Sequence, residues 1–258
     1  IKSSMRHFFI KQSEIASSTA FITGPDARHM QTVLRLKPGD KIGLFDGKGF
    51  EYEARIVALS PGRVEVSIIT GFPSTSESPV QIIVAQAFLK EKKMGGLVRQ
   101  LTELGTTKWI PFFAERSIPR PDKKHLSART ERWRKIAKES IKQCKRGRIT
   151  EIGKTVSFEE VLNLGEGCDL KIAFWENELK PINDTLPKPD RQFNNIFAMM
   201  GPEGGFTSQE IESARARGFV TAALGPRILR AETATIAACV LLQYLYGDMG
   251  QEMFVTDK

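Results

Sequence analysis

Two glycine-containing turns in the last third of the chain hold residue types that could bind a ligand and act on it. The first turn, Gly201–Phe206, contains Glu203. The second turn, Gly225–Glu232, contains Arg230 and ends in an acidic residue. Glycines let the backbone approach a ligand closely, an arginine can stabilise negative charge that develops in a reaction, and a carboxylate can act as a general base. The two turns therefore form a candidate ligand site that offers the cation of Arg230 and, in Glu203 and Glu232, two candidate bases.

Each of these features also has a simpler interpretation. A glycine turn can be only a tight connection between a strand and a helix. Glu203 and Glu232 could cap helix N-termini instead of removing protons. Arg230 lies between apolar residues and the start of an apolar helix, so we expect it to have little access to water, and an ion pair with either glutamate is the alternative to a catalytic role. Neither turn has a Gly-x-Gly-x-x-Gly or Gly-Lys-Ser/Thr pattern, which argues against a dinucleotide or triphosphate site.

A strand is predicted before each turn and a helix after it. Asn195–Met200 is an apolar segment typical of a buried strand, and Thr207 begins a capping-box pattern for a helix that Gly218 ends. Phe219–Leu224 predicts a second strand, and Thr233–Tyr246 predicts a final helix that is apolar nearly all round, as expected of a helix against the core or a partner chain. Strand–turn–helix repeats indicate a parallel sheet, whose ligand crevice lies beyond the carboxyl ends of its strands. Both glycine turns fall there.

The same alternation of strands and helices is predicted from residue 80 onward. Further strands are predicted at Val80–Phe88, Trp109–Phe113, Thr150–Gly153 and Leu170–Trp175. Further helices are predicted at Met94–Leu104, Ala128–Cys144 and Thr155–Leu164. The fold class expected for this half of the chain is therefore α/β with a parallel sheet.

The first part of the chain has a different character. Asp40–Phe45 and Phe50–Leu59 are strand-like and are joined by a hairpin signal. Several short strands with tight turns suggest a small β-barrel over residues 5–72. Residues 73–79 are rich in Pro and Ser and predict a linker, so the second domain is expected to span 80–250.

Positive charge is concentrated in one segment. The whole chain has a net charge of +8, which favours nucleic acid as a partner and, second, an anionic membrane surface. Residues 116–148 contain 13 Lys or Arg and only three acidic residues, so this segment carries more net charge than the whole chain. Such a helix surface can simply be solvated, but the scarcity of partner carboxylates favours a track for RNA phosphates.

Composition restricts the remaining classes. The 258 residues are 41% hydrophobic, which allows a folded core. Cys144, Cys168 and Cys239 have neither metal-ligand nor disulfide spacing, so we expect reduced thiols in a cytoplasmic protein and no metal site. No apolar run reaches the roughly 18–20 residues of a membrane span, and no signal-peptide pattern occurs, so no membrane partner is expected.

The segment GPEGGFTSQEIESARARGFVTAALGPRILRAETATIAACVLLQYLYGD, residues 201–248, resembles the C-terminal signature of the ribosomal RNA small-subunit methyltransferase E family. The resemblance implies a SPOUT methyltransferase domain with a parallel sheet and a deep trefoil knot, preceded by a PUA-like RNA-binding β-barrel. It further implies S-adenosyl-L-methionine as cofactor, methylation of N3 of a uridine in small-subunit ribosomal RNA, free or in the assembled subunit, and a homodimer. Ile236, Val240 and Tyr244 are the expected interface residues.

The resemblance also assigns roles to the two turns. In the functional interpretation Arg230 faces the uracil and stabilises charge on its oxygens, and Glu232 is the first candidate for the general base, with Glu203 second. The residues expected to bind the cofactor are Phe174, Met200, Gly201, Glu203, Gly204, Gly205, Leu224, Gly225, Ile228, Leu229, Arg230, Thr233 and Ala234.

The expected RNA contacts come from both domains. Lys90, Lys92 and Arg116 match cations that follow the first two strands of the family's second domain, and Gln143 and Arg146 match a Glu-Gln-Ser/Cys-x-Arg element in which Lys142 replaces the glutamate. The full set of expected RNA-binding residues is Arg6, Arg28, Arg35, Lys90, Lys92, Arg116, Lys138, Lys142, Gln143 and Arg146. For the three arginines of the barrel, a solvated surface is an equal alternative. Two other functions remain open: methylation of another RNA, since a fold does not determine a substrate, and RNA binding without catalysis.

Overall fold

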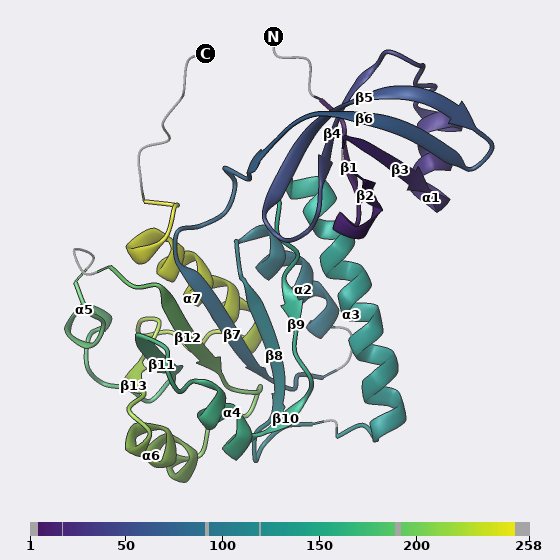
Figure 1. The fold of residues 1–258 in the computed structure, drawn as a ribbon. Coiled ribbons are helices and arrows are strands. Elements are labelled where there is room, and N and C mark those ends of the chain that lie inside the picture. The colour runs from purple at the N-terminus through teal and green to yellow at the C-terminus, as the bar shows by residue number, and fades with distance from the viewer. Residues whose placement is uncertain (1–4, 17, 91–92, 119, 189–191, 251–258) are drawn as a thin grey trace. The chain divides into compact units, whose positions relative to one another are not determined.

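The chain divides into two compact units, each with its own β-sheet (Figure 1). The first unit contains the chain up to Glu77 and the segment Glu139–Ile149, and the second contains Ser78–Lys138 and the chain from Thr150 onward. The structure is a computed structural model that describes residues 5–16, 18–90, 93–118, 120–188 and 192–250. The sequence prediction did not assign Glu139–Ile149 to the first unit, because these residues continue a helix and carry no local signal of the core that they join.

The first unit is built on a six-stranded sheet in the order β1-β4-β5-β6-β3-β2. Its strands are β1 (His7–Phe9), β2 (Ile15–Ala16), β3 (Thr19–Thr23), β4 (Lys41–Phe45), β5 (Phe50–Ser60) and β6 (Arg63–Pro73). All neighbours are antiparallel except β1 and β4, which are parallel. The sheet curls around an apolar core to which α1 (Gly24–Arg28) and the π-helical turn η2 (His29–Val33) contribute. The strands predicted around the hairpin are confirmed, whereas the short strands β1, β2 and β3 were not predicted.

The second unit contains a seven-stranded sheet in which every pair of neighbours is parallel. The order is β10-β8-β7-β12-β11-β13, and β9 pairs with β8. The strands are β7 (Gln81–Ala87), β8 (Lys108–Phe113), β9 (Glu151–Ile152), β10 (Val156–Ser157), β11 (Leu170–Phe174), β12 (Asn195–Met200) and β13 (Val220–Ala222). The prediction of an α/β fold with a parallel sheet is confirmed, and β12 has the predicted bounds.

Helices cover both faces of this sheet. They are α2 (Lys93–Glu103), α3 (Lys123–Cys144), α4 (Phe158–Leu164), α5 (Ile182–Thr185), α6 (Ser208–Ala216) and α7 (Ala231–Tyr246). Helix α3 begins five residues before the predicted start, because the Asp122 carboxylate accepts the backbone N–H of His125 at 2.9 Å and caps its first turn. Helix α7 begins two residues earlier than predicted, because the carbonyl of Arg230 accepts the N–H of Ala234 at 2.8 Å. Within the described ranges no helix is both long and apolar enough to cross a membrane.

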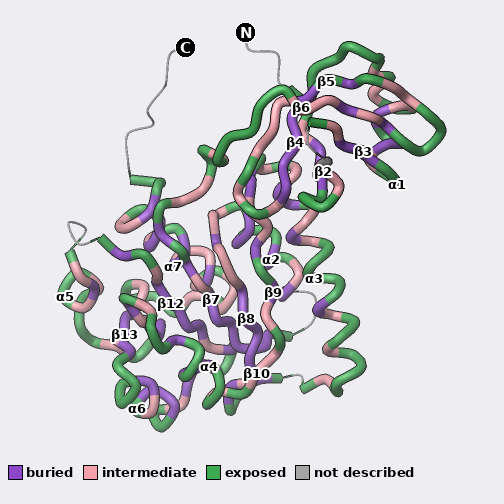
Figure 2. Tube along the Cα trace, viewed as in Figure 1, coloured by how far each residue is buried: buried purple, intermediate pink, exposed green. Residues whose placement is uncertain are grey.

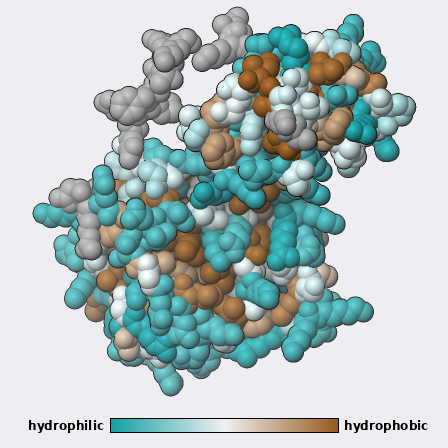
Figure 3. Space-filling model, in the orientation of Figure 1, coloured by the Kyte–Doolittle hydropathy of each residue, from teal (hydrophilic) through white to brown (hydrophobic). Residues whose placement is uncertain are grey.

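Apolar residues on both faces hold the central strands in place. In β12, Phe197 and Met199 lie in one apolar cluster with Phe206 and Ile211, which come from the α6 side. Figure 2 shows buried residues along the central strands β7, β8 and β12. On the face of the second unit seen in Figure 3, hydrophilic side chains form most of the outer surface and hydrophobic ones gather toward the middle, where the sheet lies. The sheet is thus a rigid base for the loops at its carboxyl edge.

The path of α7 bears on the predicted knot. The helix follows β13, an outer strand of the sheet, and returns to pack on the central strands β7 and β12 and on α2. A return of this kind is what a trefoil knot requires of the final segment. The knot itself stays a prediction.

Candidate functional site

A cavity of about 370 Å³ lies at the carboxyl ends of β11, β12 and β13. Phe174, Met200 and Ala222, each the last residue of its strand, contribute to the wall, and both glycine turns line it. Its volume is within the range of small-molecule sites, roughly 300–1,000 Å³. The parallel sheet thus brings the two turns together at one edge, because the carboxyl ends of its strands point the same way.

Most residues predicted to bind a cofactor line this cavity. They are Phe174, Met200, Gly201, Glu203, Gly205, Leu224, Gly225, Ile228, Leu229, Arg230 and Ala234. Gly204 and Thr233 do not line it. The lining residues that were not predicted are Lys93, Trp175, Glu176, Pro202, Ala222, Ala223, Arg227 and Ala231. All but Lys93 lie within three positions of a predicted residue, so extending the predicted segments by three residues would have included them. No local pattern indicates Lys93 as a lining residue.

The two adjacent glycines of the first turn face different neighbours. Gly205 has a φ of +67°, and a Cβ there would lie 2.0 Å from Oε1 of Glu176, a carboxylate that lines the cavity. Gly204 faces Arg116, whose Nη1 donates to the Gly204 carbonyl at 2.9 Å. Only Gly205 therefore needs to be glycine for the shape of the cavity.

The start of α6 holds this turn in place. As predicted, Thr207 and Glu210 form a capping box: the N–H of Glu210 donates to Oγ1 of Thr207 at 3.2 Å, and the N–H of Thr207 donates to Oε2 of Glu210 at 2.9 Å. Glu210 also accepts the N–H of Glu115 at 2.9 Å. The turn is thereby connected to the segment that follows β8.

A buried glutamine beneath the first turn was not predicted. Gln86 in β7 is fully buried, and its Nε2 donates to the Gly201 carbonyl at 3.2 Å. Its Oε1 accepts a hydrogen bond from Oγ1 of Thr235 in α7 at 2.6 Å. One side chain thus joins the first turn to the helix that follows the second turn. The available sequence signal was an amide near the carboxyl end of a strand whose interior is otherwise apolar.

Lys93, at the start of α2, connects the two turns electrostatically. Its Nζ lies 3.3 Å from Oε1 of Glu203 and 3.1 Å from Oε2 of Glu232. Oε1 of Glu203 also accepts the backbone N–H of Lys90 at 3.0 Å. The alternative in which Arg230 pairs with one of these glutamates is wrong, since Lys93 occupies both.

This pairing affects the candidate base Glu232. Burial raises the pKa of its carboxyl, but its own backbone N–H, the Lys93 ammonium and the charge of Arg230 outweigh burial and hold the pKa below its ordinary value. The ion pair with Glu232 raises the pKa of Lys93. Glu232 lies in the first turn of α7 and does not line the cavity. The structure therefore favours a role at the helix start over the predicted role in proton abstraction.

Arg230 differs from its predicted environment. It is exposed and lines the cavity, and its guanidinium makes no ion pair or hydrogen bond with any other described residue. The prediction of little access to water is wrong, because the second turn runs over the surface, where Ile228 is 89% exposed. Its charge still acts on Glu232. Arg230 is thus free to face a ligand, as is Arg227, which also lines the cavity and has no partner among the described residues.

The predicted RNA contacts differ in accessibility. Arg6, Arg28, Arg35, Lys90, Arg116 and Gln143 are exposed. Lys138 is half-buried, and Lys92 lies outside the described residues. Nζ of Lys142 lies 3.0 Å from Asp26 and 3.4 Å from Glu139. Glu139 precedes it by three residues on the same helix, whereas the Asp26 partner could not be predicted from the helix alone.

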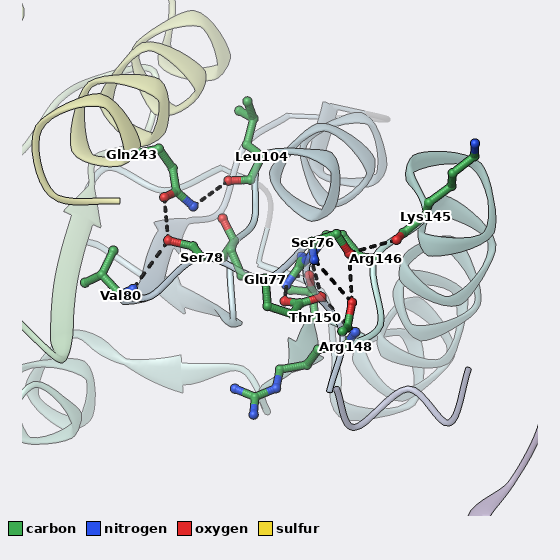
Figure 4. Close-up of polar contacts among 12 residues, drawn as sticks. Ser76, Glu77, Ser78, Val80, Leu104, Lys145, Arg146, Arg148, Thr150 and Gln243 are labelled. Carbon is green, nitrogen blue, oxygen red and sulfur yellow. Dashed lines mark hydrogen bonds and ion pairs between the residues drawn. The ribbon is translucent and has the colours of Figure 1, made fainter. Parts of the chain in front are cut away.

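Arg146 is a structural residue instead of a surface contact. Its side chain is only 3% exposed, and its Nη2 donates to Oε2 of Glu77 at 2.8 Å. Oε1 of the same carboxylate accepts the backbone N–H of Arg148 at 2.9 Å. Figure 4 shows these contacts beside the bond from Ser76 to the Lys145 carbonyl. The assignment of Arg146 to the RNA surface is therefore corrected: burial and pairing use the side chain to hold 145–148 against 76–77.

Comparisons with known proteins agree on one family. A family model described as an RNA methyltransferase domain matches residues 76–243, and one described as an RNA methyltransferase PUA domain matches residues 22–69. Ribosomal RNA small subunit methyltransferase E of Bacillus subtilis is 32% identical over 93% of this chain and 96% of its own length.

Solved structures extend this likeness to the fold. The crystal structure of a ribosomal RNA small subunit methyltransferase E from Neisseria gonorrhoeae, bound to S-adenosyl methionine, is 31% identical, covers 95% of this chain and 99% of that one, and has a TM-score of 0.83. A methyltransferase from Legionella pneumophila with bound SAM covers the same shares at 28% identity and a TM-score of 0.82. The protein therefore belongs to the ribosomal RNA small subunit methyltransferase E family of RNA methyltransferases.

Proposed function

We propose that this protein transfers a methyl group from S-adenosylmethionine to N3 of a uridine in small-subunit ribosomal RNA. The observation that carries the proposal is the cavity at the carboxyl ends of β11, β12 and β13, lined by two glycine turns and by two arginines, Arg227 and Arg230, without a partner among the described residues. Membership of the family, whose relatives are named for ribosomal RNA, gives the substrate class. The target atom, N3 of uridine, is proposed in addition, because the relatives' names do not state it.

The residues of the cavity fit the cofactor. Phe174, Leu224 and Leu229 provide apolar walls for a flat base, and Glu176 and Glu203 can accept hydrogen bonds from hydroxyl and ammonium groups. The backbone at Gly205 comes close to the cavity without a side chain in the way. When bound, S-adenosylmethionine supplies an electrophilic methyl group on a positively charged sulfur.

The remaining chemistry falls to the protein. N3 of uracil must release its proton to water before it can accept a methyl group, and the negative charge then spreads to the uracil oxygens. The guanidinium of Arg230 can donate to one of these oxygens, which lowers the pKa of the N3–H group and stabilises the anion. Holding the base in line with the methyl group supplies much of the remaining acceleration. The target base must be unstacked to enter, as is usual for enzymes that act on bases.

Mass spectrometry of small-subunit ribosomal RNA from a strain that lacks the gene tests this function. We expect one N3-methyluridine to be absent and to return with the wild-type gene but not with a gene that encodes Arg230→Ala. A methylated nucleotide missing from transfer RNA instead would favour the second candidate substrate. Isothermal titration that detects no binding of S-adenosylmethionine would favour RNA binding without catalysis.

A matched pair of glycine variants tests the cofactor placement. Gly205→Ala should weaken binding of S-adenosylmethionine about tenfold, because a Cβ at Oε1 of Glu176 displaces a cavity wall and a positive φ disfavours alanine by about 1 kcal/mol. Gly204→Ala should bind nearly normally, because its Cβ points toward Arg116. Titration calorimetry on both variants, with melting curves to check folding, gives the comparison. An equal loss of S-adenosylmethionine affinity in the two variants would contradict the placement of the cofactor in this cavity.

RNA binding is proposed for the exposed cations Arg6, Arg28, Arg35, Lys90 and Arg116, for the half-buried Lys138 and for the exposed Gln143. Phosphate neutralisation makes such binding strongly dependent on salt, with a log–log slope of about −0.7 per contact on single strands. Lys142 and Arg146 are left out because carboxylates of the protein already hold them. An RNA substrate is in keeping with the predicted cytoplasmic location.

A homodimer through α7 completes the proposal. Val240 is 39% and Tyr244 is 62% exposed on this helix, and Ile236 beside them is half-buried. Exposed apolar residues in a stripe indicate an interface. Light scattering at micromolar concentration should give twice the chain mass, and the Val240→Glu, Tyr244→Glu double variant should give the mass of one chain. A wild-type monomer would contradict the proposal.

A further inference from the structure

A second cavity, of about 520 Å³, lies in the first unit, apart from the residues assigned above. It lies between the end of β1 and the turn that follows β4. Its lining residues are Phe9, Lys11, Gln12, Ser13, Asp46 and Lys48. Two cations, an aromatic ring and a buried carboxylate around one space are an unusual combination for a solvated surface.

The cations here are not used by the fold. Lys11 and Lys48 are exposed and form no ion pair with any described residue. Nζ of Lys48 makes only a 3.3 Å contact with Oε1 of Gln12. Arg148 pairs through its backbone with Gly47 and Lys48, and Figure 4 shows its guanidinium extending away from the Glu77 contacts. Three cations therefore surround this turn, as expected of a site for phosphate groups.

One carboxylate oxygen of Asp46 is available to a ligand. The residue is only 6% exposed, and its Oδ1 accepts the N–H groups of Lys48 at 2.7 Å and Phe50 at 3.1 Å. These two hydrogen bonds from the backbone to Oδ1 stabilise the turn after β4. Its Oδ2 has no partner among the described residues, although the residue lines the cavity. A carboxylate oxygen that solvent reaches and that no described donor holds can accept an N–H group from a ligand.

Phe9 supplies a surface for a flat group. Its ring is half-buried and packs edge-on against Phe45, with 5.8 Å between ring centroids. Gly47 leaves room for it, since a Cβ there would lie 3.1 Å from Cε2 of Phe9. The rest of the ring lines the cavity. Bases of single-stranded RNA bind to such rings by stacking.

We propose that this cavity binds one nucleotide of single-stranded RNA whose base carries an exocyclic amino group. Lys11 and Lys48 contact the flanking phosphates, the base lies against Phe9, and the amino group donates to Oδ2 of Asp46. Cytosine is then preferred over uracil, because it offers an N4 amino donor where uracil has an oxygen acceptor. The inference rests on the proposed function only in that the substrate is RNA, and it adds a sequence-reading site in the unit without the methyl-transfer cavity.

Fluorescence anisotropy with labelled hexamers of cytidine and of uridine tests the site on the full-length protein. The wild type should bind the cytidine hexamer about tenfold more tightly, the value of one hydrogen bond to a charged group. Asp46→Asn retains Oδ1 for the turn and converts Oδ2 into an amide donor, so it should remove or reverse that preference. The ratio of two affinities in one protein sample does not depend on the fraction that is folded.

Lysine variants separate this site from general surface charge. Lys48→Ala should weaken both hexamers equally and reduce the log–log salt slope by about 0.7. Lys37→Ala removes an exposed lysine of the same unit that does not line the cavity, and it should change neither quantity. Equal effects of the two lysine variants would overturn the site.

An unchanged cytidine preference in Asp46→Asn would also overturn the proposal and leave Asp46 as a turn residue only. Failure of the proposed function is distinguished by separate measurements. Loss of cofactor binding or of methyl transfer, with the cytidine preference intact, would count against the methyltransferase assignment and not against this cavity. A wild type that binds both hexamers equally would refute the cavity even if methylation proceeds.

Discussion

Replacement of Arg230 by alanine is expected to lower the single-turnover rate of methyl transfer about 10²- to 10³-fold, the usual effect of removing one donor from a developing anion. The guanidinium lines the cavity and has no partner among the other described residues, so its removal leaves no protein group unpaired. Affinity for S-adenosylmethionine should therefore change little. Rapid-quench measurement of methyl transfer to RNA, with calorimetry for the cofactor, gives both quantities.

Two further variants make this result specific. Arg227→Ala removes a cation that lines the same cavity three residues earlier, and it should have a much smaller effect on the rate. Arg230→Lys keeps the charge and should recover part of the rate, although it loses the planar fork of donors. Loss of cofactor binding or folding, with a normal rate per bound complex, would make Arg230 a loop residue.

Replacement of Glu77 by alanine is expected to lower the free energy of unfolding of the first unit by about 3 kcal/mol, as when one partner of a buried ion pair is removed. Its two carboxylate oxygens accept Nη2 of Arg146 at 2.8 Å and the N–H of Arg148 at 2.9 Å. The Arg146 side chain is 3% exposed and cannot turn to water without a local rearrangement. Urea denaturation, with hydrogen exchange used to follow the first unit, measures the loss in its free energy of unfolding.

An exposed ion pair provides the control. Glu131 pairs with Arg134 on α3, and both side chains are at least half exposed, so Glu131→Ala should cost less than about 1 kcal/mol. A Glu77→Met, Arg146→Met double variant should recover much of the stability, because it leaves no buried charge. A Glu77→Ala variant as stable as the control would show that the pair contributes little.

Local sequence patterns determined much of the second unit. The apolar run Asn195–Met200 became β12 with the predicted bounds, and the Thr207–Glu210 pattern became a capping box at the start of α6. Periodicity and capping depend on residues within a few positions of each other. The order of strand, turn and helix then placed both glycine turns at one edge, because parallel strands end on the same side of a sheet.

Only the tertiary structure decided which charged groups meet. Sequence reasoning offered Arg230 as the partner of Glu203 or Glu232, but the fold brings Lys93 to both, from more than 100 residues away. Likewise, the basic segment 116–148 contains only three acidic residues, yet Asp26 pairs with Lys142 and Glu77 pairs with Arg146. A salt bridge between residues far apart in the chain produces no local sequence pattern at either partner. Its energy depends on distance and burial, and both are set by how remote segments pack.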